Sequence, residues 1–314
     1  DVVLDNLPDE VLATLSVRDE WFARLPPAAD GLEFVVADLQ RWTPGQTVRV
    51  AFLGGNEALH KDIADATAQI TEHCSLKLDF GHDPQSGSYR TWATTDTVHG
   101  AEIRVGFDQA GYFSLVGTDS IAANVRLPQG AVGGRPGQRR LNLGGFQVQK
   151  PANWQGVVRH EFLHALAFHH EHQNMRGPCE ADFRWEDDAG YEPTTDAQGR
   201  FLTDASGRRP GIYTYLAGFP NSWPKFKVDI NLRTTNNPRV VAGPFDRLSV
   251  MLYRFPPIFY KTGESACFPT GEGIDLSDGD KRGLSLLYPG AGGGLEAVMS
   301  RGRDLLGTIE RTAG

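Results

Sequence analysis

Cysteine is scarce in this chain: only Cys74, Cys179 and Cys267 occur among its 314 residues. So low and odd a count excludes a small disulfide-rich scaffold, and the lack of any Cys-x-x-Cys pair argues against a zinc site built from thiolates. One disulfide can still form. Cys179 and Cys267 are the pair we favour, because both lie in Gly- and Pro-rich sequence that is typical of loops. Three unpaired thiols are an equally good interpretation.

Long apolar runs and an excess of positive charge are also missing. No stretch of about 18 apolar residues occurs, so we expect no membrane span. The net charge of −8 and the pI of about 5.6 argue against a nucleic-acid partner. Residues 1–30 lack a basic start followed by an apolar block, so no signal peptide is visible. The composition, 40% hydrophobic and 22% charged, predicts a globular protein with a substantial core. Nothing indicates the oligomeric state.

The first half of the chain is patterned as a mixed sheet backed by a helix. Asn56 can cap a helix that runs to about residue 73, with small or apolar residues along one face. Strand-like alternation is found at residues 48–52, 76–80, 101–107 and 140–143.

The second half has two strong helix patterns separated by a long irregular stretch. One helix is expected at residues 152–167, and Ser277 can cap another that runs to about residue 288. The sequence between residues 179 and 244 is polar and turn-rich, and predicts loops. Weaker helices are expected at residues 7–22 and, after a Gly-rich linker, at residues 295–309. The predicted organisation is an N-terminal extension or propeptide-like segment at residues 1–41, a catalytic domain at 42–289, and the linker with its short helix at 290–314.

Five of the nine histidines fall between His160 and His172. His160 and His164 are four residues apart, so on a helix both project from one face and can bind one zinc ion. Glu161 completes the pattern His-Glu-x-x-His, in which the glutamate takes a proton from zinc-bound water. If the helix ends and the chain turns back, His170 supplies a third ligand, and water fills the fourth position. A helix whose histidines simply face solvent is the alternative, and the third histidine at this offset argues against it.

Residues 160–170 resemble the metzincin zinc motif, His-Glu-x-x-His-x-x-Gly-x-x-His. Phe168, His170 and Glu171 are similar to the Gly-Phe-x-His-Glu ending of the astacin family, and residues 249–253, Ser-Val-Met-Leu-Tyr, are similar to that family's Met-turn. The resemblance covers about residues 42–290. It implies an α+β, metzincin-like fold with two lobes, one catalytic zinc ion, and a protein or peptide substrate bound in extended conformation along an edge strand near residues 111–123. It also implies a secreted protein.

Two further roles follow from the resemblance. Met251 would lie beneath the three histidines as a hydrophobic floor. Tyr253 would be an additional zinc ligand in the resting enzyme, and would move aside to stabilise the oxyanion during the reaction. The alternative for both residues is simple packing in the core or beside the substrate.

The predicted function is that of a zinc-dependent endopeptidase with Glu161 as general base. A zinc amidase or exopeptidase acting on small or cell-wall peptides is one alternative, favoured if the insertion at residues 192–210 closes one end of the substrate site. A catalytically silent peptide-binding protein is another, but such proteins usually lose the base or a ligand. Asp275, Asp278 and Asp280 could suggest calcium, although a capped helix start is the better interpretation.

Three features depart from the family pattern. Ala167 stands where the motif has Gly, and a positive φ there would strain Ala by about 1 kcal/mol. Leu252 replaces the usual His of the Met-turn. About forty residues precede the first strand, where a processed astacin would bury its new amino group near Glu171, so the chain is a precursor or Glu171 has another partner. Residues 1–45 contain no Phe-x-Gly-Asp, the family's inhibitory propeptide signature, and we expect this segment to pack on the domain without blocking the zinc.

Overall fold

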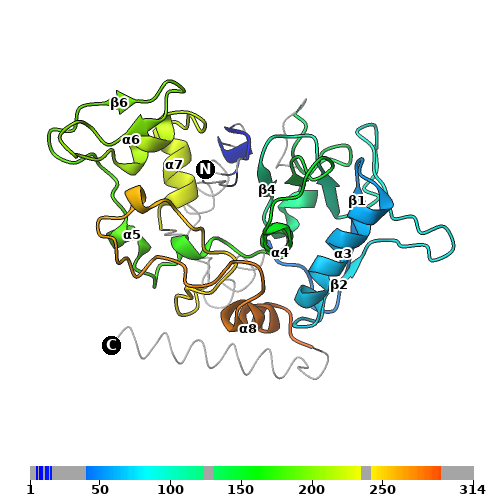
Figure 1. Ribbon diagram of the computed structural model, residues 1–314. Helices are drawn as coiled ribbons and strands as arrows, with labels where there is room; N and C mark the ends of the chain where they lie inside the picture. The colour runs from blue at the N-terminus through cyan, green and yellow to red at the C-terminus, as the bar shows by residue number, and fades with distance from the viewer. Residues whose placement is uncertain are drawn as a thin grey trace, which may run out of the picture.

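The computed structural model describes residues 5, 7–9, 11–13, 15, 40–122, 130–234 and 242–290. These residues form two lobes. In Figure 1 the N-terminal lobe, with α3 and strands β1 to β4, lies on the right, and the C-terminal lobe, with α5 to α7, lies on the left. No helix in the described ranges is long and apolar enough to cross a membrane.

A five-stranded sheet is the centre of the N-terminal lobe. Its spatial order is β2 (Lys77–Asp79), β1 (Thr47–Phe52), β3 (Ile103–Gly106), β5 (Leu141–Leu143) and β4 (Tyr112–Ser114). The first four strands are parallel, and β4 runs antiparallel to β5. The four strands predicted from alternation are all present, and the edge strand lies within the predicted range. Among the described residues β4 is paired on one side only, which leaves its other side an open edge.

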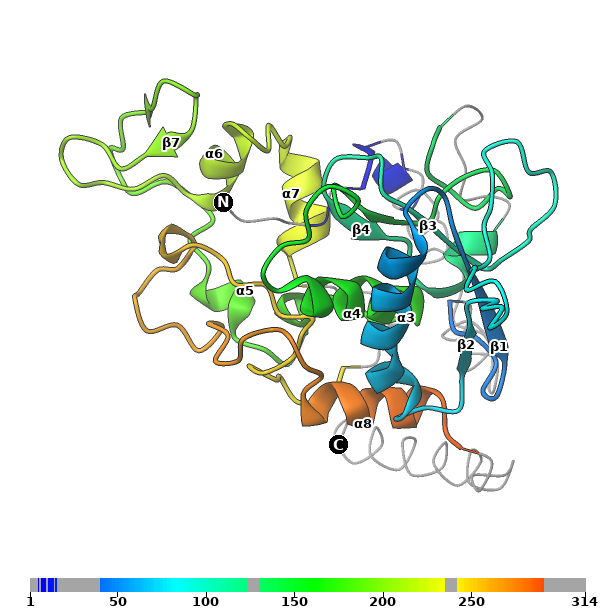
Figure 2. The ribbon, with the colours of Figure 1, turned by 45° about the vertical axis from the view of Figure 1, so that its right-hand side comes forward.

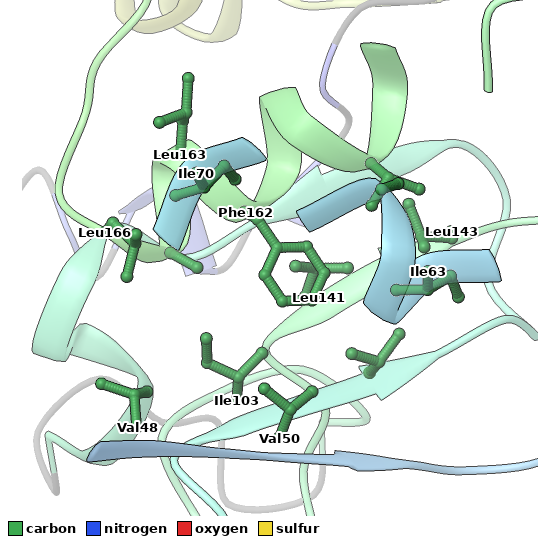
Figure 3. Packing of buried hydrophobic residues seen from close by; sticks show 14 of the residues in the cluster. Val48, Val50, Ile63, Ile70, Ile103, Leu141, Leu143, Phe162, Leu163 and Leu166 are labelled. Atoms are coloured by element: carbon green, nitrogen blue, oxygen red, sulfur yellow. The ribbon is translucent and has the colours of Figure 1, made fainter. Parts of the chain in front are cut away.

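Helices α3 (Glu57–Thr71) and α4 (Trp154–Ala165) pack together against this sheet. Asn56 caps α3 as predicted, since its side chain accepts a hydrogen bond from the Leu59 N–H at 2.9 Å. Figure 3 shows Ile63 and Ile70 of α3 and Phe162 of α4 facing the strand residues. All three side chains are fully buried. Burying each contributes about 2 kcal/mol, so the core fixes α4 firmly in the lobe.

The C-terminal lobe contains more regular structure than the sequence predicted. It has α5 (Cys179–Asp182), the hairpin of β6 (Thr194–Thr195) and β7 (Phe201–Leu202), α6 (Ile212–Ala217) and α7 (Lys225–Leu232). The prediction of loops alone was therefore wrong. Both α6 and α7 are short and have no side-chain cap, so the sequence carries few of the usual start signals. The predicted disulfide between Cys179 and Cys267 is confirmed, and Cys74 is unpaired.

Helix α8 (Asp278–Leu287) runs beneath both lobes (Figures 1 and 2). Its predicted cap is confirmed: Ser277 and Asp280 form a reciprocal capping box. Short 3-10 helices complete the fold, η1 (Gly117–Ile121), η2 (Glu171–Gln173) and η3 (Pro257–Phe259). Of the predicted helix at residues 7–22, residues 9, 11–13 and 15 are helical and most of the rest lies outside the described residues, as does the predicted helix at 295–309.

Candidate metal centre

Helix α4 carries the first two histidines of the predicted zinc motif. The ring centroids of His160 and His164 are 4.8 Å apart, and both rings are buried. The helix lies very close to the chain crossing it: a Cβ at Gly156 would be 1.9 Å from the carbonyl oxygen of Gly273. Only glycine fits at that point, so Gly156 allows the close approach that seats the helix.

A tight turn after α4 returns the chain to these histidines. Ala167 adopts a left-handed conformation with φ of 71°, so the strain expected at this position is present. Beyond it, the Phe168 N–H bonds to the carbonyl of Leu163 at 3.0 Å, which closes the turn. As a result the ring centroid of His170 lies 4.5 Å from the ring centroid of His164.

Four buried side chains are arranged to hold a metal ion: Asp5, His160, His164 and His170, whose ligand atoms all lie within 4.8 Å of one another. The outer nitrogens of two of the rings are fixed by carbonyls. Nδ1 of His160 is 2.8 Å from the Val250 oxygen, and Nδ1 of His164 is 2.8 Å from the Phe168 oxygen. Because a carbonyl only accepts, each Nδ1 carries a hydrogen. Each Nε2 is thereby aimed inward, which is the arrangement typical of metal-bound histidine.

The inner atoms of this group lie close together. Nε2 of His164 is 3.1 Å from Nε2 of His170 and 3.0 Å from Oδ2 of Asp5. Burial and the nearby His164 hold the pKa of His170 well below its usual range, so that ring is neutral. Ring nitrogens and carboxylate oxygens placed this close together can share one cation. Three imidazoles and a carboxylate are ligands that suit zinc, so the residues present fit the ion.

The backbone of the predicted Met-turn contacts the histidine segments, because the Val250 carbonyl is 2.8 Å from Nδ1 of His160 and the Met251 carbonyl accepts from the Glu171 N–H at 2.9 Å. Met251 is 1% exposed and packs in the main core. The turn is fastened to α8 because Asp280 accepts hydrogen bonds from the Ser249 hydroxyl at 2.6 Å and from the Val250 N–H at 3.1 Å. The carbonyl of Val250 in turn holds His160. The turn therefore connects α8 to a metal-facing ring.

Glu161 and Tyr253 border the same point. Glu161 is 1% exposed, and its Oε2 has no hydrogen-bond partner among the described residues. Burial, together with the carboxylate of Asp5, raises the pKa of Glu161 well above its usual range. The hydroxyl of Tyr253 is 3.0 Å from Nε2 of His170, and its ring centroid is 5.2 Å from that of His160. Five residues singled out in the sequence are thus brought together: His160, Glu161, His164, His170 and Tyr253. The sixth, Met251, contacts this group through its backbone carbonyl, which accepts from the Glu171 N–H.

Asp5 is the site residue that the sequence did not indicate. Its Oδ2 is 3.1 Å from Nε2 of His170, its Oδ1 is 3.8 Å from Nε2 of His160, and its backbone N–H donates to the Tyr253 hydroxyl at 2.9 Å. Burial raises the pKa of Asp5, but the histidines outweigh burial and hold it well below its usual range. The expectation that this segment leaves the metal site clear was wrong. It relied on a local signature, whereas 165 residues separate Asp5 from His170.

Glu171 follows the third histidine and has its own partners. Its carboxylate accepts from the Asp246 N–H at 2.8 Å and from the Asn174 amide at 3.0 Å. Burial raises the pKa of Glu171 to about 7. In the described part of this structure the partners of Glu171 are therefore Asp246 and Asn174 and not an amino terminus. This was one of the two alternatives raised by the sequence.

The acidic residues considered for calcium have structural roles. Asp280 serves the α8 cap and the Met-turn, Asp275 pairs with Arg159 at 3.0 Å, and the side chain of Asp278 is 87% exposed. These contacts match the interpretation of a capped helix start. Across the described ranges, the one group of His, Cys, Asp and Glu side chains arranged for a metal ion is the His and Asp5 site.

Comparison with known proteins gives matches in structure only. No protein-family model and no curated protein sequence matches this chain. Among solved structures, myroilysin aligns with a TM-score of 0.53 and 24% identity, covering 80% of this chain and 96% of that one. The chain has the fold of myroilysin. This similarity confirms the α+β, metzincin-like fold that the motifs implied.

Two further structures align less closely than this first one. A second myroilysin structure has a TM-score of 0.47 and 21% identity, covering 80% of this chain and 86% of its own. High choriolytic enzyme 1, a hatching enzyme zinc-protease from the medaka fish Oryzias latipes, has a TM-score of 0.43 and 14% identity, covering 81% and 96%. At these identities the chemistry of the present chain has to be derived from its own site.

Proposed function

We propose that this protein is a zinc-dependent endopeptidase and that the chain as folded here is its latent form. One observation carries the proposal: the Nε2 atoms of three buried histidines converge on one point beside the buried carboxylate of Glu161. A purely structural histidine cluster has no need of an adjacent buried carboxylate whose Oε2 has no hydrogen-bond partner among the described residues, because leaving such an atom buried costs about 1–3 kcal/mol.

The roles of the residues follow from their positions. A zinc ion held by His160, His164 and His170 would polarise the scissile carbonyl and lower the pKa of a bound water toward about 7. Glu161, with its raised pKa, is suited to accept the proton of the attacking water and to pass it to the leaving amine. The Tyr253 hydroxyl lies 3.0 Å from Nε2 of His170 and can donate to the oxyanion.

The open edge of β4 suits an extended peptide substrate. Leu115 donates to the Arg140 carbonyl at 2.8 Å and Gly144 donates to that of Gly111 at 3.0 Å, so alternate residues of β4 are bonded to β5. The backbone groups of Tyr112 and Ser114 therefore point away from the sheet. A substrate strand can add to them, and strand addition accepts chain on both sides of the cleaved bond, which favours an endopeptidase.

Latency follows from the place of Asp5. Its carboxylate faces all three histidines, and its backbone N–H engages Tyr253. Water and substrate need the same space, so catalysis requires that Asp5 leave. The segment would then act as an inhibitor carried on the enzyme's own chain.

The alternative of a one-ended amidase or exopeptidase site finds less support. The insertion at residues 192–210 folds as the β6–β7 hairpin, and Phe219 next to α6 donates to its Gly199 carbonyl at 3.0 Å. Its contacts thus lie within the C-terminal lobe. The Cys179–Cys267 disulfide is typical of oxidising compartments, which supports the expectation of secretion.

The test combines metal analysis with proteolysis. Asp5→Ala and Asp5→Ala/Glu161→Gln are purified with zinc, and the bound metal and the cleavage of casein are measured. We expect about one zinc per chain in both variants and internal cleavage by the first alone. Zinc in both with no cleavage by either would favour the silent binding protein. Absence of zinc from both would refute the metal site.

A further inference from the structure

The N-terminal segment rests on a surface that extends well beyond the metal site. Val11 is 2% exposed and packs with Phe113, Leu115 and Val132 of the N-terminal lobe. Leu7 and Leu15 join the same cluster. Val11 and Leu15 are both helical and four residues apart, so they lie on one face of the helix, and Leu7 precedes the helical residues. This part of the segment therefore contacts the N-terminal lobe through apolar side chains spaced four residues apart.

The opposite lobe supplies a cation to the same segment. Nζ of Lys227, on α7, is 2.6 Å from Oδ1 of Asp9, and the Lys227 side chain is only 7% exposed. The ammonium also lies 5.2 Å from the ring centroid of Trp223. A carboxylate beside a buried ammonium offsets the cost of removing its charge from water. Figure 1 shows this N-terminal helix between α7 and β4.

We propose that this surface, formed by Phe113, Leu115, Val132 and Lys227 and here termed the docking surface, binds protein substrates once the segment is displaced. The occupant is a substrate segment with apolar side chains at every fourth position and a carboxylate on its flank. The inference rests on the proposed peptidase function and adds a substrate class to it. Displacement uncovers apolar side chains and removes the carboxylate of Asp9, and a segment of the same chemistry restores both contacts.

The position of the docking surface determines what it selects. Asp9 is four residues beyond Asp5. A substrate segment held beside Lys227 therefore lies close to the peptide bond that is cleaved at the metal. Recognition then depends on residues outside the immediate neighbourhood of the cleaved bond. Proteins that carry such a segment would be cut in preference to short peptides with the same cleavage sequence.

Direct binding is the first test, and it needs no turnover. Asp5→Ala/Val11→Asp places a charge against the apolar cluster to displace the segment, and circular dichroism checks its fold. A fluorescent peptide with the sequence of residues 7–15 is titrated and its anisotropy measured. We expect binding that weakens at least about tenfold when Lys227→Gln is added. The matched control is Lys225→Gln, an exposed lysine of the same helix paired with Asp229, which should leave binding unchanged. Absence of binding, or equal binding by the Lys227→Gln protein, would overturn the proposal.

Kinetics provides the second test. A fluorogenic peptide is presented to the Asp5→Ala/Val11→Asp protein with and without residues 7–15 appended through a flexible linker. We expect KM to be about tenfold lower for the appended substrate, and this difference to disappear with Lys227→Gln but not with Lys225→Gln. Equal KM values for the two substrates in the parent variant would refute docking. Failure to cut either substrate would instead count against the peptidase function, and the anisotropy titration would still decide whether the surface binds.

Discussion

Oδ2 of Asp5 lies 3.0 Å from Nε2 of His164, so the beginning of the described chain reaches the centre of the metal site. On the proposed latency, only the fraction of molecules in which this contact has opened binds substrate. We expect Asp5→Ala to raise casein cleavage at least about 100-fold over the unsubstituted chain, because it removes the group that competes for the site. Asp65→Ala, which removes an exposed carboxylate on α3, is the control and should change nothing. Equal activity of the Asp5→Ala and unsubstituted proteins would show that the segment does not inhibit.

The link between α8 and the Met-turn predicts an effect on metal binding from outside the ligand set. Asp280→Asn replaces the charged acceptor of the Ser249 hydroxyl and the Val250 N–H. We expect the free energy of unfolding to fall by about 1–3 kcal/mol and zinc affinity to fall about 10–100-fold, because His160 is held by the same turn. Chemical denaturation and a competitive zinc chelator measure the two effects. Asp278→Asn, on the exposed side of the same helix start, should leave both unchanged.

The left-handed turn after α4 predicts a stabilising substitution. Ala167→Gly removes the steric cost of a positive φ, about 1–2 kcal/mol. It also raises the conformational entropy of the unfolded chain, which lowers stability by about 0.4–1 kcal/mol. We expect a net gain of about 0.5–1 kcal/mol, measured as a higher midpoint in urea. Ala68→Gly, at an exposed position within α3, should lower stability by about 0.5–1 kcal/mol. A loss of stability in Ala167→Gly would mean that the methyl group contributes more by packing than it costs in strain.

The disulfide predicts a large effect for one pair of cysteines and a small one for the third. Cys179 and Cys267 are 88 residues apart, so their bridge closes a long loop. Replacing both with Ser should cost about 4 kcal/mol of stability at room temperature through the entropy returned to the unfolded chain. The readout is thermal unfolding without reductant. Cys74→Ser is the control, and because this thiol is unpaired and half-buried we expect a loss of less than about 1 kcal/mol.

Local sequence patterns predicted the parts of this fold that depend on local interactions. Asn56 and Ser277 marked the starts of α3 and α8 because a cap acts within three residues of itself. The spacing of His160 and His164 likewise depends only on helix geometry. Helices α6 and α7 were missed because they are short, have no side-chain caps and are held by packing within the lobe.

The contact made by Asp5 could not be inferred in the same way. Nothing in its neighbouring residues distinguishes it from other aspartates of the chain, and its partners are histidines brought together by folding. The cluster formed by Val11 with Phe113 is likewise a contact between distant parts of the sequence. Such contacts depend on how the lobes are assembled, which no local pattern encodes.

The proposed inhibition by Asp5 has a kinetic consequence, because Asp5 is covalently connected to the site that it faces. An inhibitor that binds as a separate molecule dissociates on dilution, whereas a group on the same chain acts at a fixed effective concentration, on the order of millimolar for a short flexible tether. Latency of this kind is independent of how much protein is present, and lowering the concentration cannot relieve it. It ends only when the tether is cut or when another ligand outcompetes the segment, and a cut makes the change irreversible once the released piece diffuses away.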